Sequence, residues 1–234
     1  HHRHGLYSEY SNKVMDILRS YTPLFQQVSI DEAFLDVSDL PKPAGVIAQE
    51  IQERVDHELH LPCSLGVATN KLVAKIANDF GKSQVESGQA PRQITIVPPR
   101  KEAAFVAPLD IQSLWGIGPK TSQKLHGQGI HTIGQLAALS IAELEAYFGN
   151  NALEIHTRAL GIYPSPVHSE REVKSVSNEV TFTKDTTDSE VLRQTLRALA
   201  DKVGYRLRQA GLAGSVVQIK LRYSDFETLT RQTA

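Results

Sequence analysis

Two adjacent carboxylates, Asp31 and Glu32, lie within a run of residues that favours a β-sheet. Charged groups beside apolar residues are costly to bury unless a cation or a strong hydrogen-bond donor compensates them. Because neighbouring side chains on a strand point to opposite faces, both can serve one ligand only if the chain turns between them. A hairpin with strands over residues 27–30 and 33–37 brings both to one edge. Such carboxylates suit Mg²⁺, which takes few protein ligands; the alternative is a surface turn with ordinary solvated acids.

A second candidate group lies on the helix predicted over residues 71–80. Lys71, Lys75 and Asp79 recur every four residues there and so share one face of the helix. Taken alone, such a stripe is usually a solvated face. The opposite face is expected to be buried and consists of Leu72, Val73, Ile76 and Phe80.

A third candidate is the turn around Gly116 and Gly118, which separates two predicted helices and precedes Pro119. Glycine lets the backbone approach a phosphate closely, and a helix N-terminus offers unpaired N–H groups to it. Lys120 and Lys124 follow and add positive charge. Contacts of this kind hold the nucleic-acid backbone and read no base sequence. The alternative is a plain turn between two helices.

Four segments of the chain, in order, resemble the signatures of the Y-family DNA polymerases, the translesion enzymes that include bacterial DNA polymerase IV. They are residues 29–36 and 64–77 for the palm, 114–121 for the thumb and 174–179 for the little finger. The resemblance implies an α+β fold. It would comprise a palm with a small antiparallel sheet and packed helices, an all-helical helix-hairpin-helix thumb and a partial α/β little finger.

The same resemblance implies template-directed transfer of deoxynucleotides to a primer 3′-hydroxyl, assisted by two Mg²⁺ ions. Asp31 and Glu32 would be metal ligands, and Glu32 would hold the metal that activates the hydroxyl. Lys75 would contact the incoming triphosphate, whereas a contact of Lys71 with DNA or nucleotide stays open. The thumb turn, with its two glycines and two lysines, would contact primer–template DNA.

Periodicity and turn signals predict four segments: a palm over residues 1–98, a thumb over 99–163, a linker over 164–173 and a little finger over 174–234. Asn70 is a predicted N-cap, and Ser140 with Glu143 is a predicted capping box. The helices and strands expected outside the thumb are helices 10–21, 46–59, 71–80 and 189–210 and strands 64–68, 93–97 and 215–223.

A palm of this family also begins with a strand that bears a third metal-binding aspartate, followed by the fingers. Because residue 1 corresponds to a point beyond the fingers, we expect the chain to be truncated at both ends and not to extend a primer by itself. The resemblance further implies deoxynucleoside triphosphates as substrates, low fidelity and processivity, a monomer, and a sliding clamp bound through a C-terminal tail outside this chain. The rival hypothesis is a catalytically silent DNA-binding module.

Composition adds weaker constraints. With 41% apolar and 22% charged residues, the 234-residue chain has the composition of an ordinary globular protein. It has no apolar run near the ~18 residues of a membrane span and no signal-peptide core. The single cysteine, Cys63, excludes an internal disulfide, fits a reducing bacterial cytoplasm and is expected to be buried.

The charge distribution favours the same assignment slightly. The net charge is −1, but residues 1–97 hold 9 Lys and Arg against 12 Asp and Glu, whereas residues 174–234 hold 10 against 7. The acidic part contains the predicted metal ligands and the basic part a predicted DNA contact. His1, His2 and His4 are interpreted as tag or loop residues and not as a metal site.

Overall fold

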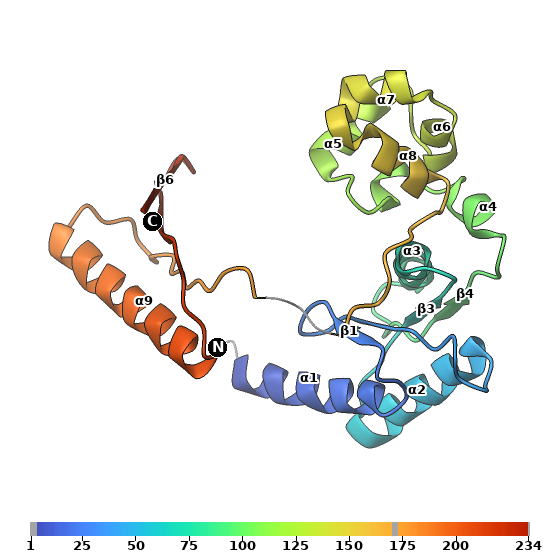
Figure 1. Cartoon of the computed structure of the whole chain (residues 1–234), viewed down its shortest axis with the longest axis horizontal. Coiled ribbons are helices and arrows are strands. Elements are labelled where there is room, and N and C mark those ends of the chain that lie inside the picture. Colours follow the sequence, from blue (N-terminus) through green and yellow to red (C-terminus); the bar gives the residue numbers. More distant parts are fainter. Residues whose placement is uncertain (1–3, 170–172, 234) are drawn as a thin grey trace. The chain divides into compact units, whose positions relative to one another are not determined.

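The structure, a computed structural model, describes residues 4–169 and 173–233 and comprises two compact units (Figure 1). Unit 1 is His1–Glu170 and unit 2 is Arg171–Ala234. The division falls within the segment 164–173. His1 and His2 lie outside the described residues, and the backbone of His4 begins the first helix.

The first part of unit 1 contains two strand pairs and three helices. Its elements are α1 (His4–Arg19), β1 (Phe25–Gln27), β2 (Ala33–Leu35), α2 (Ala44–Leu59), β3 (Leu65–Val67), α3 (Lys71–Ser83) and β4 (Ile94–Ile96). β1 and β2 form an antiparallel hairpin in which Gln26 lies opposite Phe34. The hairpin around the two carboxylates is therefore confirmed, but the bounds of its first strand are wrong: that strand was expected over 27–30 and lies at Phe25–Gln27, so residues 28–32 form a loop. The second strand is shorter than expected.

The expectation of an antiparallel sheet is wrong for the second pair, because β3 and β4 are parallel. The chain crosses from one strand to the other through α3, and a helical crossover of this kind joins parallel neighbours. α3 packs very closely on β3: a Cβ on Gly66 would lie 1.9 Å from the carbonyl oxygen of Ala74. The side chain of Asn70 accepts a hydrogen bond from Val73 N at 3.0 Å, so the predicted N-cap of α3 is confirmed.

The second part of unit 1 is helical, as predicted. Its elements are α4 (Glu102–Val106), η1 (Ile111–Ser113), α5 (Pro119–His126), α6 (Ile133–Ala137), α7 (Ile141–Phe148), η2 (Gly149–Asn151) and α8 (Ala152–Ala159). The predicted capping box of α7 is present, since Ser140 and Glu143 each bond the other's backbone N–H. α6 carries a second capping box, formed by Thr132 and Gln135.

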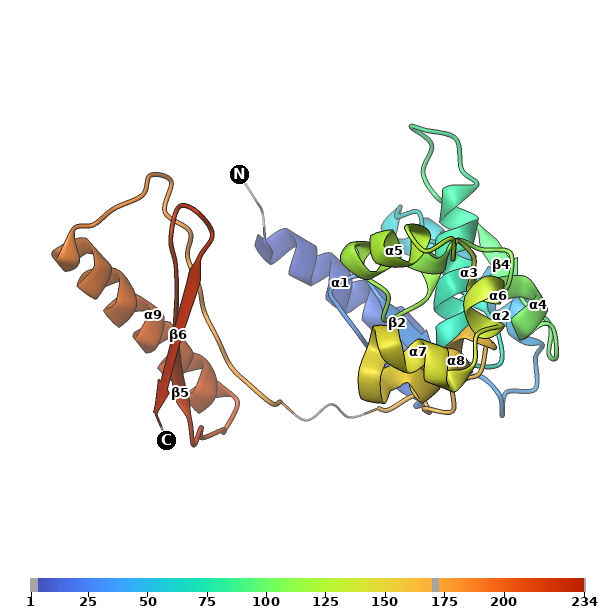
Figure 2. The same ribbon diagram turned by 90° about the horizontal axis from the view of Figure 1, so that it is seen from above.

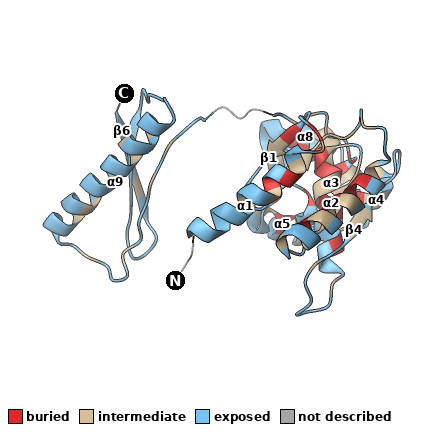
Figure 3. Ribbon diagram, turned by 90° about the horizontal axis from the view of Figure 1, so that it is seen from below, coloured by how far each residue is buried: buried red, intermediate tan, exposed pale blue. Residues whose placement is uncertain are grey.

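One apolar core joins α3 to the helical second part of unit 1, and Figure 3 shows buried segments on several of its helices. Leu72, Val73 and Ile76 of α3 join the same cluster as Leu114 and Leu125. A smaller cluster lies between α1 and α2 and contains Ile17, Ile47, Ile51 and Val55. Because a single core spans residues 72–159, the boundary expected between residues 98 and 99 stays a prediction.

Two burial predictions have different outcomes. Phe80, expected in the core, is 36% exposed and packs edge-to-face on Phe105, with ring centroids 5.6 Å apart, so that prediction is wrong. Its helical phase places it at the border between the apolar and polar faces of α3. Cys63 is partly buried beside the smaller core cluster, and burial raises the pKa of its thiol.

Unit 2 contains α9 (Ser189–Gln209) and the antiparallel strands β5 (Val217–Arg222) and β6 (Thr228–Thr233) (Figure 2). Among residues 173–233 none is buried. Polar contacts connect the preceding extended segment to the other elements: Lys220 pairs with Glu179 at 2.7 Å, and Arg206 donates to the carbonyl of Ser177 at 2.8 Å. Within the part of the chain that the structure describes, no helix is long and apolar enough to cross a membrane.

Candidate active site

The loop between β1 and β2 is held by its own backbone and by α1. The carbonyl of Glu32 accepts hydrogen bonds from the N–H groups of Val28 and Ser29, at 2.9 and 3.2 Å. The hydroxyl of Ser11 on α1 donates to the carbonyl of Ile30. These bonds fix the five-residue loop 28–32 that carries both carboxylates.

The two carboxylates have different surroundings. Asp31 is exposed, and its Oδ1 accepts a hydrogen bond from the hydroxyl of Ser29 at 2.7 Å. The side chain of Glu32 is 38% exposed, and its Oε1 lies 3.0 Å from Nζ of Lys75 on α3. The same ammonium lies 3.5 Å from Oδ2 of Asp79. The structure therefore joins Glu32 and Lys75, whose roles were predicted separately.

Lys75 is held in its charged form by these neighbours. Burial by itself lowers the pKa of this side chain, but the hydrogen bond to Glu32 and the negative charges of Asp79 and Glu32 outweigh it. The pKa of Lys75 therefore lies above its ordinary value. An ammonium that remains charged offers a fixed positive centre beside the carboxylate hairpin.

Lys71, one turn earlier on α3, is not a solvated residue. It is only 7% exposed, its Nζ donates to Oε1 of Gln26 at 2.9 Å, and burial lowers its pKa. Lys71 and Lys75 thus contact the hairpin, whereas the side chain of Asp79 is 53% exposed. The interpretation as an ordinary solvated face is wrong for Lys71, because the hairpin packs against it.

The turn after η1 contains one glycine with a positive φ, Gly116, and one glycine beside open space, Gly118. Gly116 has φ +106°, and a Cβ there would lie 2.6 Å from Nη1 of Arg158. Gly118 has φ −84° and ψ 171°, and no heavy atom lies within 4 Å of the position of its missing Cβ. Gly118 therefore leaves open space in front of α5, whose first turn contains Pro119 and has no side-chain cap.

The two predicted DNA-contacting lysines lie on α5, and both are exposed. Lys120 is in the first turn of the helix, close to its free N–H groups. Lys124 is in the last turn, with Nζ 5.4 Å from the ring centroid of Tyr147. Their positive charges therefore lie at opposite ends of the helix, and Lys120 lies nearer to the glycine turn.

An open groove of about 570 Å³ brings the palm and thumb candidates together. Lys75 and Asp79 line one side, and Trp115 and Gly116 line the other. Gly118, Lys120 and Lys124 do not line it. The groove is therefore bordered by the lysine bonded to Glu32 and by the first glycine of the thumb turn.

Asp31 and Glu32 fit a partial set of ligands for a divalent cation. Both offer hard carboxylate oxygens from one short loop, and both side chains remain accessible to solvent. Within residues 4–169 and 173–233, no group of three or more His, Cys, Asp and Glu side chains is placed to hold a metal ion. A cation that completes its shell with water and substrate phosphates suits such a set, as Mg²⁺ does.

Three residues of the site were missed by the sequence interpretation. Trp115 contacts the rings of Phe34 and Tyr163, and Arg158 donates from Nη1 to the carbonyl of Trp115 at 3.0 Å. The one usable signal is that Trp115, the only tryptophan of the chain, directly precedes the glycine turn. Arg158 and Tyr163 carry no comparable local signal.

Comparison with protein families gives three matches. Residues 2–79 match the impB/mucB/samB family, residues 99–130 match the IMS family HHH motif, and residues 173–234 match the impB/mucB/samB family C-terminal domain.

Among curated proteins, the chain is 42% identical over 232 residues to DNA polymerase IV of Dehalococcoides mccartyi strain BAV1, which covers 98% of this chain and 57% of that protein. It is 40% identical over 231 residues to DNA polymerase IV 1 of Bacillus subtilis strain 168, which covers 97% of this chain and 54% of the relative. The chain thus spans a little over half the length of these relatives.

Among solved structures, the fold matches a Y-family DNA polymerase chimera with a TM-score of 0.85 at 24% identity, over 99% of this chain and 65% of that one. It also matches an insertion ternary complex of Dbh DNA polymerase with a TM-score of 0.68 at 23% identity, over 99% and 65% of the two chains. The α+β fold is therefore that of the Y-family DNA polymerases, with palm, helix-hairpin-helix thumb and partial little finger.

The two glycines of the turn should respond differently to alanine. Gly116→Ala forces a side chain into a positive-φ conformation and against the Arg158 guanidinium, so we expect it to cost about 1–3 kcal/mol of the free energy of unfolding. Gly118→Ala meets open space at an ordinary φ and should change that free energy by less than about 0.5 kcal/mol. Urea unfolding of unit 1 measures both, and equal costs would contradict the described turn.

Proposed function

Because the chain belongs to the impB/mucB/samB family, we propose that it is part of a template-directed DNA polymerase of the translesion type. The observation that carries the proposal is the position of Lys75. It bonds the predicted catalytic Glu32 and at the same time lines a groove with Gly116 of the predicted DNA-binding turn. Lys75 thus connects the carboxylate of Glu32 to a groove that the first glycine of the turn borders.

We assign Asp31 and Glu32 as the catalytic metal ligands. When bound, two Mg²⁺ ions would stabilise the attacking primer hydroxyl and the leaving pyrophosphate. The chain's own contribution is the loop 28–32, whose backbone hydrogen bonds fix the segment that carries both carboxylates. The ion pair between Lys75 and Glu32 joins side chains that are 29% and 38% exposed. Pairs of such exposure are worth at most about 1 kcal/mol, so Glu32 can exchange this partner for a cation.

We assign Lys75 as the contact for the incoming deoxynucleoside triphosphate. Its ammonium stays charged and lines the open groove, so a phosphate oxygen can reach it. Lys71 has no such role in the proposal, since its Nζ is buried and already bonded to Gln26.

We assign the turn at Gly116 and Gly118, with Lys120 and Lys124, as a binding site for the backbone of primer–template DNA. The open space at Gly118 and the uncapped first turn of α5 leave backbone N–H groups accessible to a phosphate. These groups hold the backbone without reading the bases. The solved relatives include a complex titled as an insertion ternary complex, which supports DNA and nucleotide as partners. As further parts of the proposal, the protein acts as a monomer in the bacterial cytoplasm, and the longer protein binds a sliding clamp.

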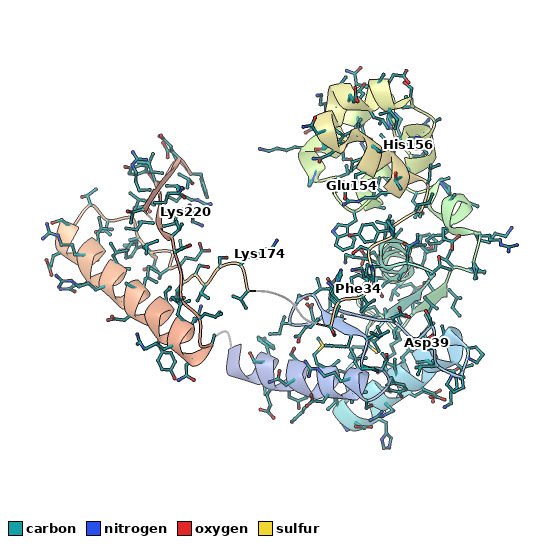
Figure 4. All side chains as sticks on the ribbon, in the orientation of Figure 1. Phe34, Asp39, Glu154, His156, Lys174 and Lys220 are labelled. Carbon is teal, nitrogen blue, oxygen red and sulfur yellow. The ribbon has the colours of Figure 1, made fainter. Side chains whose placement is uncertain are left out.

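The carboxylate assignment is tested by primer extension with a polypeptide of the relatives' full length that contains these residues. Asp31→Asn and Glu32→Gln keep the shape of each side chain and remove its charge. We expect the rate of single-nucleotide incorporation to fall by at least about 10²-fold, as loss of a charge-stabilising group does, while DNA affinity stays within twofold. Asp39→Asn, at an exposed position after β2, is the control (Figure 4). Near-normal rates in both variants would leave the DNA-binding module as the better hypothesis.

The nucleotide assignment predicts that Lys75→Ala affects kinetics more than folding. A lost charge-assisted contact of about 1.5–3 kcal/mol lowers kcat/KM for the nucleotide by roughly one to two decades. The melting temperature should change little, because the side chain is partly exposed and alanine is a good helix former. Lys13→Ala removes an ion-paired lysine from α1 and is the matched control. A lowered melting temperature with unchanged kinetics would make Lys75 a structural residue.

The DNA-binding site is tested on the 234-residue chain itself, by fluorescence anisotropy with duplexes of different sequence. Affinity should fall with salt, with a log–log slope of roughly −0.9 per phosphate neutralised, and should hardly depend on sequence. Gly118→Val places a branched side chain in the open space before α5 and should weaken binding, whereas Gly5→Val, at an equally open position on α1, should not. Sequence-selective or salt-independent binding would exclude the thumb assignment.

A further inference from the structure

Three aromatic rings from separate parts of unit 1 stack where β2 meets the thumb turn. The ring centroids of Phe34 and Trp115 are 6.2 Å apart with the planes at 29°, and those of Trp115 and Tyr163 are 5.7 Å apart at 34°. Phe34 lies on β2 and is labelled in Figure 4. Trp115 precedes the glycine turn, and Tyr163 follows α8. Contacts of this geometry contribute beyond their buried area. The stack therefore links the hairpin, the thumb turn and the segment that leaves the thumb.

Two cations hold this stack. Nζ of Lys71 lies 6.0 Å from the ring centroid of Phe34 and 5.9 Å from that of Tyr163. The guanidinium of Arg158 lies 5.6 Å from the Tyr163 ring and also donates to the carbonyl of Trp115. Cations over ring faces are attracted most strongly where water is excluded, and Lys71 is almost fully buried. Both cations thereby add to the contacts among the three rings.

The stack is directly connected to the predicted catalytic carboxylate. Glu32 is the last residue of the loop 28–32, and Phe34 lies two residues further on, in β2. Lys75 and Lys71 are four residues apart on α3 and share a face. Lys75 meets Glu32 and Lys71 meets Phe34, which places the hairpin in register with the helix. A displacement of the Phe34 ring would therefore move Glu32 relative to Lys75.

Trp115 is not needed for the thumb core. Its neighbours Leu114 and Ile117 supply that core and are 1% and 4% exposed, whereas Trp115 is 38% exposed and borders the groove. Leu114 and Ile117 are members of the apolar core cluster, and Trp115 is not. The indole is thus placed between the hairpin and the thumb, where it contacts Phe34 and Tyr163.

We propose that Trp115 is a positioning residue: by stacking on Phe34 it sets the hairpin at the place where Glu32 meets Lys75, and so couples the thumb turn to the catalytic carboxylates. The proposal rests on the proposed function, because Glu32 must be a catalytic group for its position to matter. It adds a coupling between two sites that would otherwise be independent. One is the phosphate-binding turn of the thumb, and the other is the pair of metal-binding carboxylates on the hairpin.

The test is hydrogen exchange at the amides of Val28 and Ser29, which both donate to the carbonyl of Glu32. It is made on the 234-residue chain without DNA or nucleotide. Trp115→Leu removes both ring contacts and should raise exchange at these two amides about tenfold, the factor that corresponds to about 1.4 kcal/mol of stacking. Trp115→Phe keeps a ring and should restore exchange to within about threefold.

The control is Tyr147→Leu, which removes a thumb ring that contacts Phe148 and lies under Lys124, away from the hairpin. It should leave the two hairpin amides unchanged. The reciprocal measurement uses Trp115 emission, which no other tryptophan obscures. Phe34→Leu should shift that emission to longer wavelength, because the indole becomes more exposed to water.

Two results would overturn the proposal. One is a rise in exchange that is uniform over unit 1 in Trp115→Leu, which would mean general destabilisation. The other is unchanged exchange at the hairpin amides. Neither result depends on polymerase activity, so failure of the proposed function in the extension assay and failure of Trp115 as a positioning residue are separate outcomes.

Discussion

α3 packs against other parts of unit 1 on two faces, and the rest of the unit depends on these two contacts. One face of the helix supplies Leu72, Val73 and Ile76 to the core shared with the thumb. The other presents Lys71 and Lys75 to the hairpin that carries Glu32. Burying two ammonium groups beside an apolar core is costly unless each is compensated. A carboxylate compensates Lys75, whereas an amide oxygen and two ring faces compensate Lys71.

The contacts of Lys75 and those of Lys71 differ in their exposure to water and in how easily another ligand can replace them. The partly exposed pair of Lys75 and Glu32 is screened by water and can be broken by a competing ligand. The contacts of Lys71 are enclosed, and breaking them would leave a buried charge without a partner. The helix therefore combines an exchangeable contact at the groove with a permanent one at the stack. The carboxylate of Glu32 can change partners there while the hairpin stays in place.

Local signals predicted those parts of the structure that depend on neighbouring residues. Asn70 as an N-cap, the Ser140 and Glu143 capping box and the turn at Gly116 all follow from short-range hydrogen bonding or backbone freedom. The burial of Lys71 and the stacking of Trp115 could not be predicted in this way. Each depends on a residue far away in sequence, and the periodicity of α3 shows which side chains share a face but not what covers that face.

The separation in sequence of the stacked rings also bears on the order of folding. β3, α3 and β4 follow one another directly, and Gly66 lets the first strand lie against the helix, so their contacts close short loops. Phe34, Trp115 and Tyr163 can meet only after long loops close, which loop-closure entropy disfavours early in folding. We therefore expect the geometry around Glu32 to be completed after the contacts among β3, α3 and β4 have formed.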